Sequence, residues 1–225
     1  FMGVELSFDR ALAQSADGRS IAAVPVTAGP SLGGGAPEHV LFTFGGTKTP
    51  EPLDFRQPQL RVYPVGGLRA LDPSVAKEVS DLHALLMAQP ALVSPPLPVF
   101  PLPVAPQVFR ANIAFVPFKG GSGIRFLTTF RQDVGPITNE GLVYTFQGLT
   151  SDGRYYVAMY WPVATGVLPD SSQDVPAPGD VDALARSFDQ YVATTTAKLD
   201  ALGSDAFVPD LTQLDMLASS VRIVR

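Results

Sequence analysis

Histidine and cysteine, which often act as bases, nucleophiles and metal ligands, are scarce in this sequence of 225 residues. It contains no cysteine and two histidines, His39 and His83. The missing cysteines exclude disulfides, thiolate nucleophiles and cysteine-based metal sites. Neither histidine has a second histidine at metal-ligand spacing, so we interpret both as structural or surface residues. We therefore predict no metal, no cofactor and no catalytic residue.

Carboxylates and serines offer two further chemistries. Asp133 and Glu140 flank a loop, and two carboxylates that face each other across a cleft can hydrolyse a glycoside. Their spacing carries no specificity, because acidic loop residues are mostly solvated. Gly121-Ser122-Gly123 lacks the flanking residues of a nucleophile elbow or a phosphate loop, and turn chemistry explains it. Residues 170–174 lack the glycine and the bidentate glutamate of a calcium loop.

The remaining candidate lies on two predicted β-hairpins in the centre of the chain. Residues 109–118 and 124–132 form the first hairpin, and residues 142–150 and 154–163 form the second. Asp152-Gly153 favours the positive φ angles of a tight turn, so it fixes the register of the second hairpin.

This register predicts the two faces of the sheet. One face is expected to be the aromatic core and to carry Ile113, Phe115, Phe126, Phe130, Tyr144, Phe146, Met159 and Trp161. The other face gathers side chains that can bind an anion, a sugar or a protein partner: Arg125, Thr129, Arg131, Gln147, Tyr156 and Tyr160. The alternative is a plain solvent face or one covered by a helix. A one-residue error in either loop would exchange the faces.

Helices and further strands are expected around these hairpins. Asp72 and Pro73 mark the start of a helix that runs to residue 88, because Asp caps helices and Pro suits their first position. A second helix is predicted from Asp180 or Asp182 to Leu202, and a shorter one starts at Pro209-Asp210. Short strands are predicted at Val4–Phe8, Ile21–Val26, Val40–Phe44, Gln59–Tyr63 and Ser220–Val224.

Together these elements predict an α+β fold with a mainly antiparallel sheet of about five to seven strands, covered by helices; an α-β-α sandwich would fit. We expect one domain over residues 1–225, with the proline-rich stretch 94–106 as a packed crossover. Residues 84–109 are uncharged for longer than a membrane span needs, but their prolines exclude a transmembrane helix.

Charge narrows the set of partners. The net charge is −5, the charged fraction is 16%, and no run of Lys or Arg exists. Nucleic-acid binding and electrostatic docking to an anionic membrane both need such a basic patch, so neither is expected.

Two sequence stretches resemble a known group of proteins. Gly123–Thr128 and Tyr144–Val157 look like the most specific block of an uncharacterised family of bacterial extracytoplasmic, lipoprotein-like proteins, and the likeness extends from about Val4 to the C-terminus. The resemblance implies an extracytoplasmic location and a membrane tether ahead of the domain. Leu214-Asp215 and Ser219-Ser220-Val221 also resemble the ending of the PsbP/Mog1-type α-β-α fold.

These observations favour a non-catalytic extracytoplasmic domain that binds a protein, a small molecule or a carbohydrate. One alternative is a hydrolase whose Asp or Glu residues come together only in the fold, which a deep pocket with two carboxylates would support. The other is a carrier of a small apolar ligand, which a closed cavity of about 300 Å³ or more would support.

Overall fold

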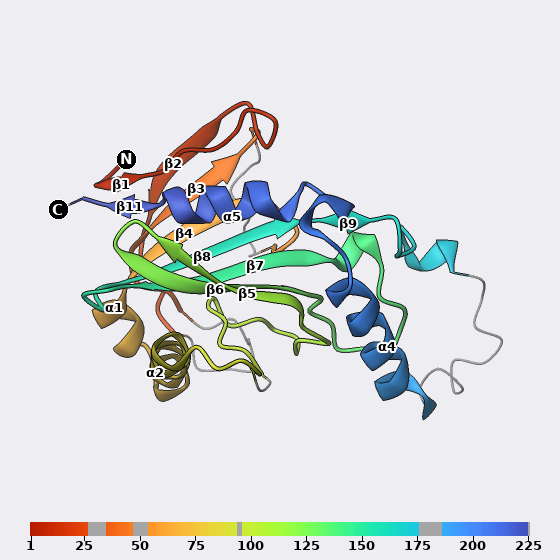
Figure 1. Ribbon diagram of the computed structural model, residues 1–225. Coiled ribbons are helices and arrows are strands. Elements are labelled where there is room, and N and C mark those ends of the chain that lie inside the picture. The colour runs from red at the N-terminus through yellow and green to blue at the C-terminus, as the bar shows by residue number, and fades with distance from the viewer. Residues whose placement is uncertain (27–34, 47–53, 94–95, 176–185, 225) are drawn as a thin grey trace.

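The structure is a computed structural model that describes residues 1–26, 35–46, 54–93, 96–175 and 186–224 (Figure 1). At its centre lies an antiparallel sheet of seven strands in the order β2-β3-β4-β8-β7-β6-β5. The prediction of an α+β fold with a mainly antiparallel sheet is therefore confirmed. The strands are β2 (Ala16–Ile21), β3 (His39–Phe44), β4 (Gln59–Pro64), β5 (Ala111–Phe118), β6 (Gly121–Thr128), β7 (Val143–Thr150) and β8 (Tyr155–Pro162).

The hairpin of β7 and β8 has the predicted register. Phe146 pairs with Met159, and Tyr144 pairs with Trp161. Gly153 has a φ of +67° in the connecting turn, a conformation that glycine adopts without strain. A local turn signal was therefore sufficient to place two neighbouring strands.

The register between β6 and β7 differs from the prediction. Phe126 pairs with Thr145, and Arg125 pairs with Phe146. Phe115, Phe126 and Phe130 therefore lie on the sheet face opposite to Tyr144 and Phe146, and the expectation of one shared aromatic face is wrong. Both faces of the central strands are buried, so no alternation of polar and apolar residues marks which side faces inward.

One face of the sheet is covered by α1 (Val65–Arg69), α2 (Pro73–Ala88) and the proline-rich stretch, of which residues 96–106 are described. Asp72 caps α2 as predicted, accepting hydrogen bonds from the backbone N–H groups of Ser74 (2.7 Å) and Val75 (3.1 Å). The proline-rich stretch is not a linker at this point, because three of its side chains are buried in the same core: Leu97, Val99 and Phe100.

The opposite face packs against α5 (Leu211–Ser220), which lies along the sheet in Figure 1, and α4 (Phe188–Asp200) reaches this side of the core near its end. The shorter helix starts as predicted, and Asp210 caps it by accepting from the Thr212 N–H at 2.7 Å. The predicted start of the long helix, at 180 or 182, lies outside the described residues. Helices thus cover both faces of the sheet.

Several short elements complete the fold. They are β1 (Val4–Glu5) paired with β11 (Arg222–Ile223), β9 (Ala164–Thr165) paired with β10 (Phe207–Val208), and the 3₁₀ helices η1 (Asn139–Gly141), η2 (Ser172–Asp174) and η3 (Ser204–Ala206). The predicted strand Ile21–Val26 is wrong: β2 ends at Ile21, and Val24 makes only a single bridge to Ala36. The sequence of β2 is mostly polar because it is an edge strand, so its hydrophobic pattern was weak.

Candidate functional site

The six side chains proposed from sequence do not share one open face. Five of them are buried, with exposed fractions of 7% or less, and Arg131 is half-buried. The sheet separates Arg125 from Gln147, Tyr156 and Tyr160, because the register of β6 places Arg125 on the α5 side. Thr129 and Arg131 lie beyond the end of β6. The six residues therefore form three separate groups.

Arg125 serves the contact between the sheet and α5. Its Nε lies 3.4 Å from Asp215 Oδ1, and its Nη1 donates to the backbone oxygen of Asn112. The same Asp215 oxygen accepts a hydrogen bond of 2.8 Å from the Tyr144 hydroxyl. Burial raises the pKa of Asp215, and the Arg125 charge opposes that shift. The functional groups of Arg125 are therefore used inside the protein.

Gln147, Tyr156 and Tyr160 bind the protein's own proline-rich stretch. The Gln147 side-chain oxygen accepts from the Phe100 N–H (3.1 Å) and from the Tyr156 hydroxyl (2.6 Å). The Gln147 amide donates to the Tyr160 hydroxyl (3.0 Å), which in turn donates to the Phe100 carbonyl (2.8 Å). The four residues form a closed, fully buried network. The predicted ligand-binding groups thus hold the crossover against the sheet.

Thr129 and Arg131 line a pocket of about 270 Å³ at the end of the sheet. The pocket is formed where the segment before β4, the end of β6, η1 and η2 meet. Its wall contains Arg56, Thr129, Phe130, Arg131, Pro136, Thr138, Glu140, Gly141 and Ser172. The sequence carries no motif at Arg56, Thr138 or Ser172, because only the fold brings these distant segments together.

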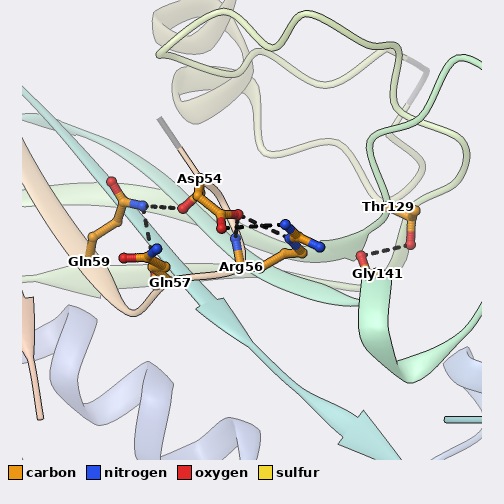
Figure 2. Close-up of polar contacts among 6 residues, drawn as sticks. All are labelled: Asp54, Arg56, Gln57, Gln59, Thr129 and Gly141. Atoms are coloured by element: carbon orange, nitrogen blue, oxygen red, sulfur yellow. Dashed lines mark hydrogen bonds and ion pairs between the residues drawn. The ribbon is translucent and has the colours of Figure 1, made fainter. Parts of the chain in front are cut away.

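Hydrogen bonds fix the two sides of this pocket. Figure 2 shows the Arg56 side chain extending from Asp54 toward Thr129 and Gly141. The Thr129 hydroxyl donates to the Gly141 carbonyl at 3.0 Å, which ties the end of β6 to η1. Gln59 donates to the backbone oxygens of Asp54 (2.7 Å) and Gln57 (3.3 Å), so the segment that carries Arg56 is held against β4.

The charges around the pocket are balanced within the protein. Arg56 pairs with Asp54 at 3.1 Å, and Arg131 pairs with Asp133 at 2.7 Å. The pKa of Arg56 is raised, first by its hydrogen bond to Asp54 and also by the charges of Asp54 and Glu140. Asp133 and Glu140, the carboxylates considered for hydrolysis, therefore lie near arginines rather than facing each other as a free pair.

An aromatic stack forms the inner side of the pocket. The Phe55 ring lies 4.8 Å from the ring of Phe130 and 4.6 Å from the ring of Tyr160. Phe130 lines the pocket, whereas Tyr160 belongs to the buried face of the sheet. The stack thus stands between the pocket and the sheet interior.

A larger hollow of about 450 Å³ lies between α2 and the proline-rich stretch and includes Glu78 and Asp81. Burial raises the pKa of Glu78, and its carboxylate accepts from the Val99 N–H at 3.1 Å. Asp81 pairs with Lys77 on the exposed side of the helix. Because Glu78 and Asp81 lie within one turn of the same helix, they cannot flank a glycosidic bond from opposite sides.

A third hollow, of about 460 Å³, lies between α4 and the start of β5. Its wall includes Arg110, Asp189 and Asp200. Charged side chains in both larger hollows make them poor sites for an apolar ligand.

Within the described ranges, no three His, Cys, Asp or Glu side chains are grouped to hold a metal ion. In that same part of the chain, no helix has the length and hydrophobicity needed to cross a bilayer. The acidic stretch 170–174 is occupied by its own contacts, since Asp174 accepts from the backbone N–H and hydroxyl of Ser171.

Comparison of the chain with protein-family models, with curated proteins and with solved structures finds no match.

Proposed function

We propose that this chain is a non-catalytic binding domain whose ligand is a small saccharide bound in the pocket of Arg56, Thr129 and Arg131. The observation that carries the proposal is the composition of the pocket wall: two guanidinium groups, hydroxyls and a carboxylate beside a phenylalanine ring. Hydroxyl-rich ligands need both donors and acceptors, and an aromatic ring offers an apolar surface for a sugar ring.

Charge balance supports a hydroxylated ligand over a simple anion. Each arginine of the wall already has a carboxylate partner, Asp54 or Asp133, and Glu140 adds a further negative charge. An isolated phosphate or sulfate would have to compete with these carboxylates. A sugar hydroxyl can accept from the guanidinium N–H groups that remain and donate to Glu140 at the same time.

Pocket size supports a ligand of one ring. Pockets for drug-sized molecules have volumes of roughly 300–1,000 Å³, and this one has about 270 Å³. A monosaccharide, or the terminal unit of a longer glycan, suits this volume.

The test is calorimetric titration of the protein with glucose. We expect saturable binding that is weakened about tenfold by Arg56→Gln and by Thr129→Val, because one hydrogen bond to a charged or polar group contributes about 1–2 kcal/mol. Arg154→Gln is the matched control: Arg154 is exposed and follows the β7–β8 turn, roughly 25 Å away along β7. Glucose binding that neither pocket variant weakens, or no saturable binding at all, would contradict the proposal.

An extracytoplasmic location is part of the same proposal and is supported by the sequence resemblance alone. Cell fractionation of the source organism with an antibody against the chain tests it. Recovery in the envelope or in the medium is expected, and recovery with cytosolic markers would contradict it.

A further inference from the structure

Beneath the aromatic stack, polar side chains form a row across the sheet. The strand register places Thr43 opposite Gln59, Gln59 opposite Tyr160, and Tyr160 opposite Thr145. All four side chains are buried on the face covered by α2 and the proline-rich stretch. Arg61, two residues after Gln59, belongs to the same face. A sheet face under helices is normally apolar, so this row requires an explanation.

Three atoms of this face have no hydrogen-bond partner among the described residues: Thr43 Oγ1, Arg61 Nη2 and Thr145 Oγ1. Buried polar atoms are nearly always bonded, because an unpaired one costs about 1–3 kcal/mol. The three atoms lie on β3, β4 and β7, so they are spread along the row.

Arg61 is a buried cation without an acidic partner within the described ranges. Its exposed fraction is 4%, and none of the ion pairs found there includes it. Its Nε donates to the Gln59 side-chain oxygen at 2.8 Å, and its Nη1 donates to His39 Nε2 at 3.1 Å. Both partners are neutral, because His39 Nδ1 donates to the Pro37 carbonyl at 2.9 Å and Nε2 is thereby left as the acceptor. Among the residues that the structure describes, the positive charge of Arg61 is therefore uncompensated.

The aromatic stack joins this row to the pocket. Phe55 contacts Tyr160 on one side and Phe130 on the other. Phe55 is only half-buried, and the charge of Arg61 acts on the Tyr160 hydroxyl. Phe55 therefore lies between Phe130, which lines the pocket, and Tyr160, which belongs to the row.

We propose that the saccharide of the preceding section is acidic, and that its carboxylate passes Phe55 to bind Arg61 Nη2 and the Thr43 hydroxyl. This inference rests on the proposed function, because the pocket supplies the entrance. A carboxylate suits the site since it accepts hydrogen bonds only, and both groups can donate.

The experiment compares glucuronate with glucose on the intact protein by calorimetric titration. We expect glucuronate to bind at least tenfold more tightly, and Thr43→Val to remove that advantage while glucose binding is unchanged. Thr43→Val is informative because the hydroxyl has no hydrogen-bond partner in the described part of the chain, so the variant should keep its stability. Thr195→Val, a buried threonine of α4, is the matched control.

A second variant tests the route. Phe55→Ala should raise the association rate of glucuronate several-fold in stopped-flow measurements and should leave the rate for glucose unchanged. Equal affinities for glucuronate and glucose, with no effect of Thr43→Val, would overturn the inference and leave the proposed function standing. Absence of binding of either sugar would overturn both.

Discussion

At the scale of single residues, the polar side chains considered for ligand binding form hydrogen bonds and ion pairs within the protein. Gln147, Tyr156 and Tyr160 hold the backbone of Phe100, and Arg125 joins β6 to Asp215 of α5. Residue types that suit ligand binding also suit internal networks, since both require hydrogen bonds in a place that excludes water. Only the register of the strands distinguishes the two uses.

His39 leads to a prediction about pH. Its pKa is lowered from 6.5 to about 4, and burial is the largest cause. The hydrogen bond to the Pro37 carbonyl raises the pKa, and the charge of Arg61 lowers it further. The groups that face it are Arg61, Pro37 and the ring of Tyr63, 4.4 Å away. In the unfolded chain His39 is therefore protonated near pH 6.5, whereas in the folded protein it is protonated only near pH 4.

Because the folded-state pKa is depressed, the stabilisation is complete above pH 6.5 and is lost as the pH falls toward 4. We expect this histidine to contribute a loss of about 2–3 kcal/mol in the free energy of unfolding over that interval. Urea denaturation of wild type and His39→Gln at several pH values measures it. His83→Gln, at an exposed position of α2, should keep the wild-type slope. A slope unchanged in His39→Gln would refute the assignment.

At the scale of elements, the sequence predicted the features that depend on short local motifs, namely helix starts and a tight turn. Asp72 and Asp210 mark the starts of α2 and α5, and Asp152-Gly153 set the register of β7 and β8. The β6–β7 register was not predictable, because a long connection replaces the tight turn and both faces of the sheet are covered. The pocket was predictable only in part: Thr129 and Arg131 were chosen for their residue types, whereas Arg56 comes from a segment without a motif.

Close packing of β6 on β7 gives a second prediction. Gly123 pairs with Gly148, and a Cβ added at Gly123 would lie 2.3 Å from Cζ of Phe146. Gly123→Ala should therefore lower the free energy of unfolding by about 1–3 kcal/mol, because the ring cannot move without disturbing the core.

The control for this variant is Gly66→Ala in α1. A Cβ there meets no atom within 4 Å, and alanine favours a helix, so the variant should gain about 0.5–1 kcal/mol. Urea denaturation of both variants checks that the free energy of unfolding falls in Gly123→Ala and rises in Gly66→Ala. An unchanged free energy of unfolding in Gly123→Ala would show that the strands can separate enough to admit a methyl group.

At the scale of the whole molecule, the sheet separates two cores. Trp161, the sole tryptophan, lies on the α5 side, and Leu82 lies on the α2 side. Both layers are built on the same strands, so we predict that they unfold together as one domain.

Leu82→Ala tests this cooperativity. The cavity should cost about 2–5 kcal/mol, and the Trp161 fluorescence transition in urea should shift as far as the far-UV circular dichroism transition. Met87→Ala, at an exposed position of the same helix, should shift neither. A Trp161 transition that stays in place while the dichroism transition moves would show two independent units.

The pairing of β1 with β11 also has a mechanical consequence. Val4 lies opposite Ile223, and the Val224 N–H donates to the Gly3 carbonyl at 2.6 Å, so the two end segments lie side by side (Figure 1). A force that pulls residues 1 and 224 apart would act at one end of this short ladder and would break its hydrogen bonds one after another, as in a zipper. The ends would peel away at low force, before the load reached the strands of the seven-stranded sheet.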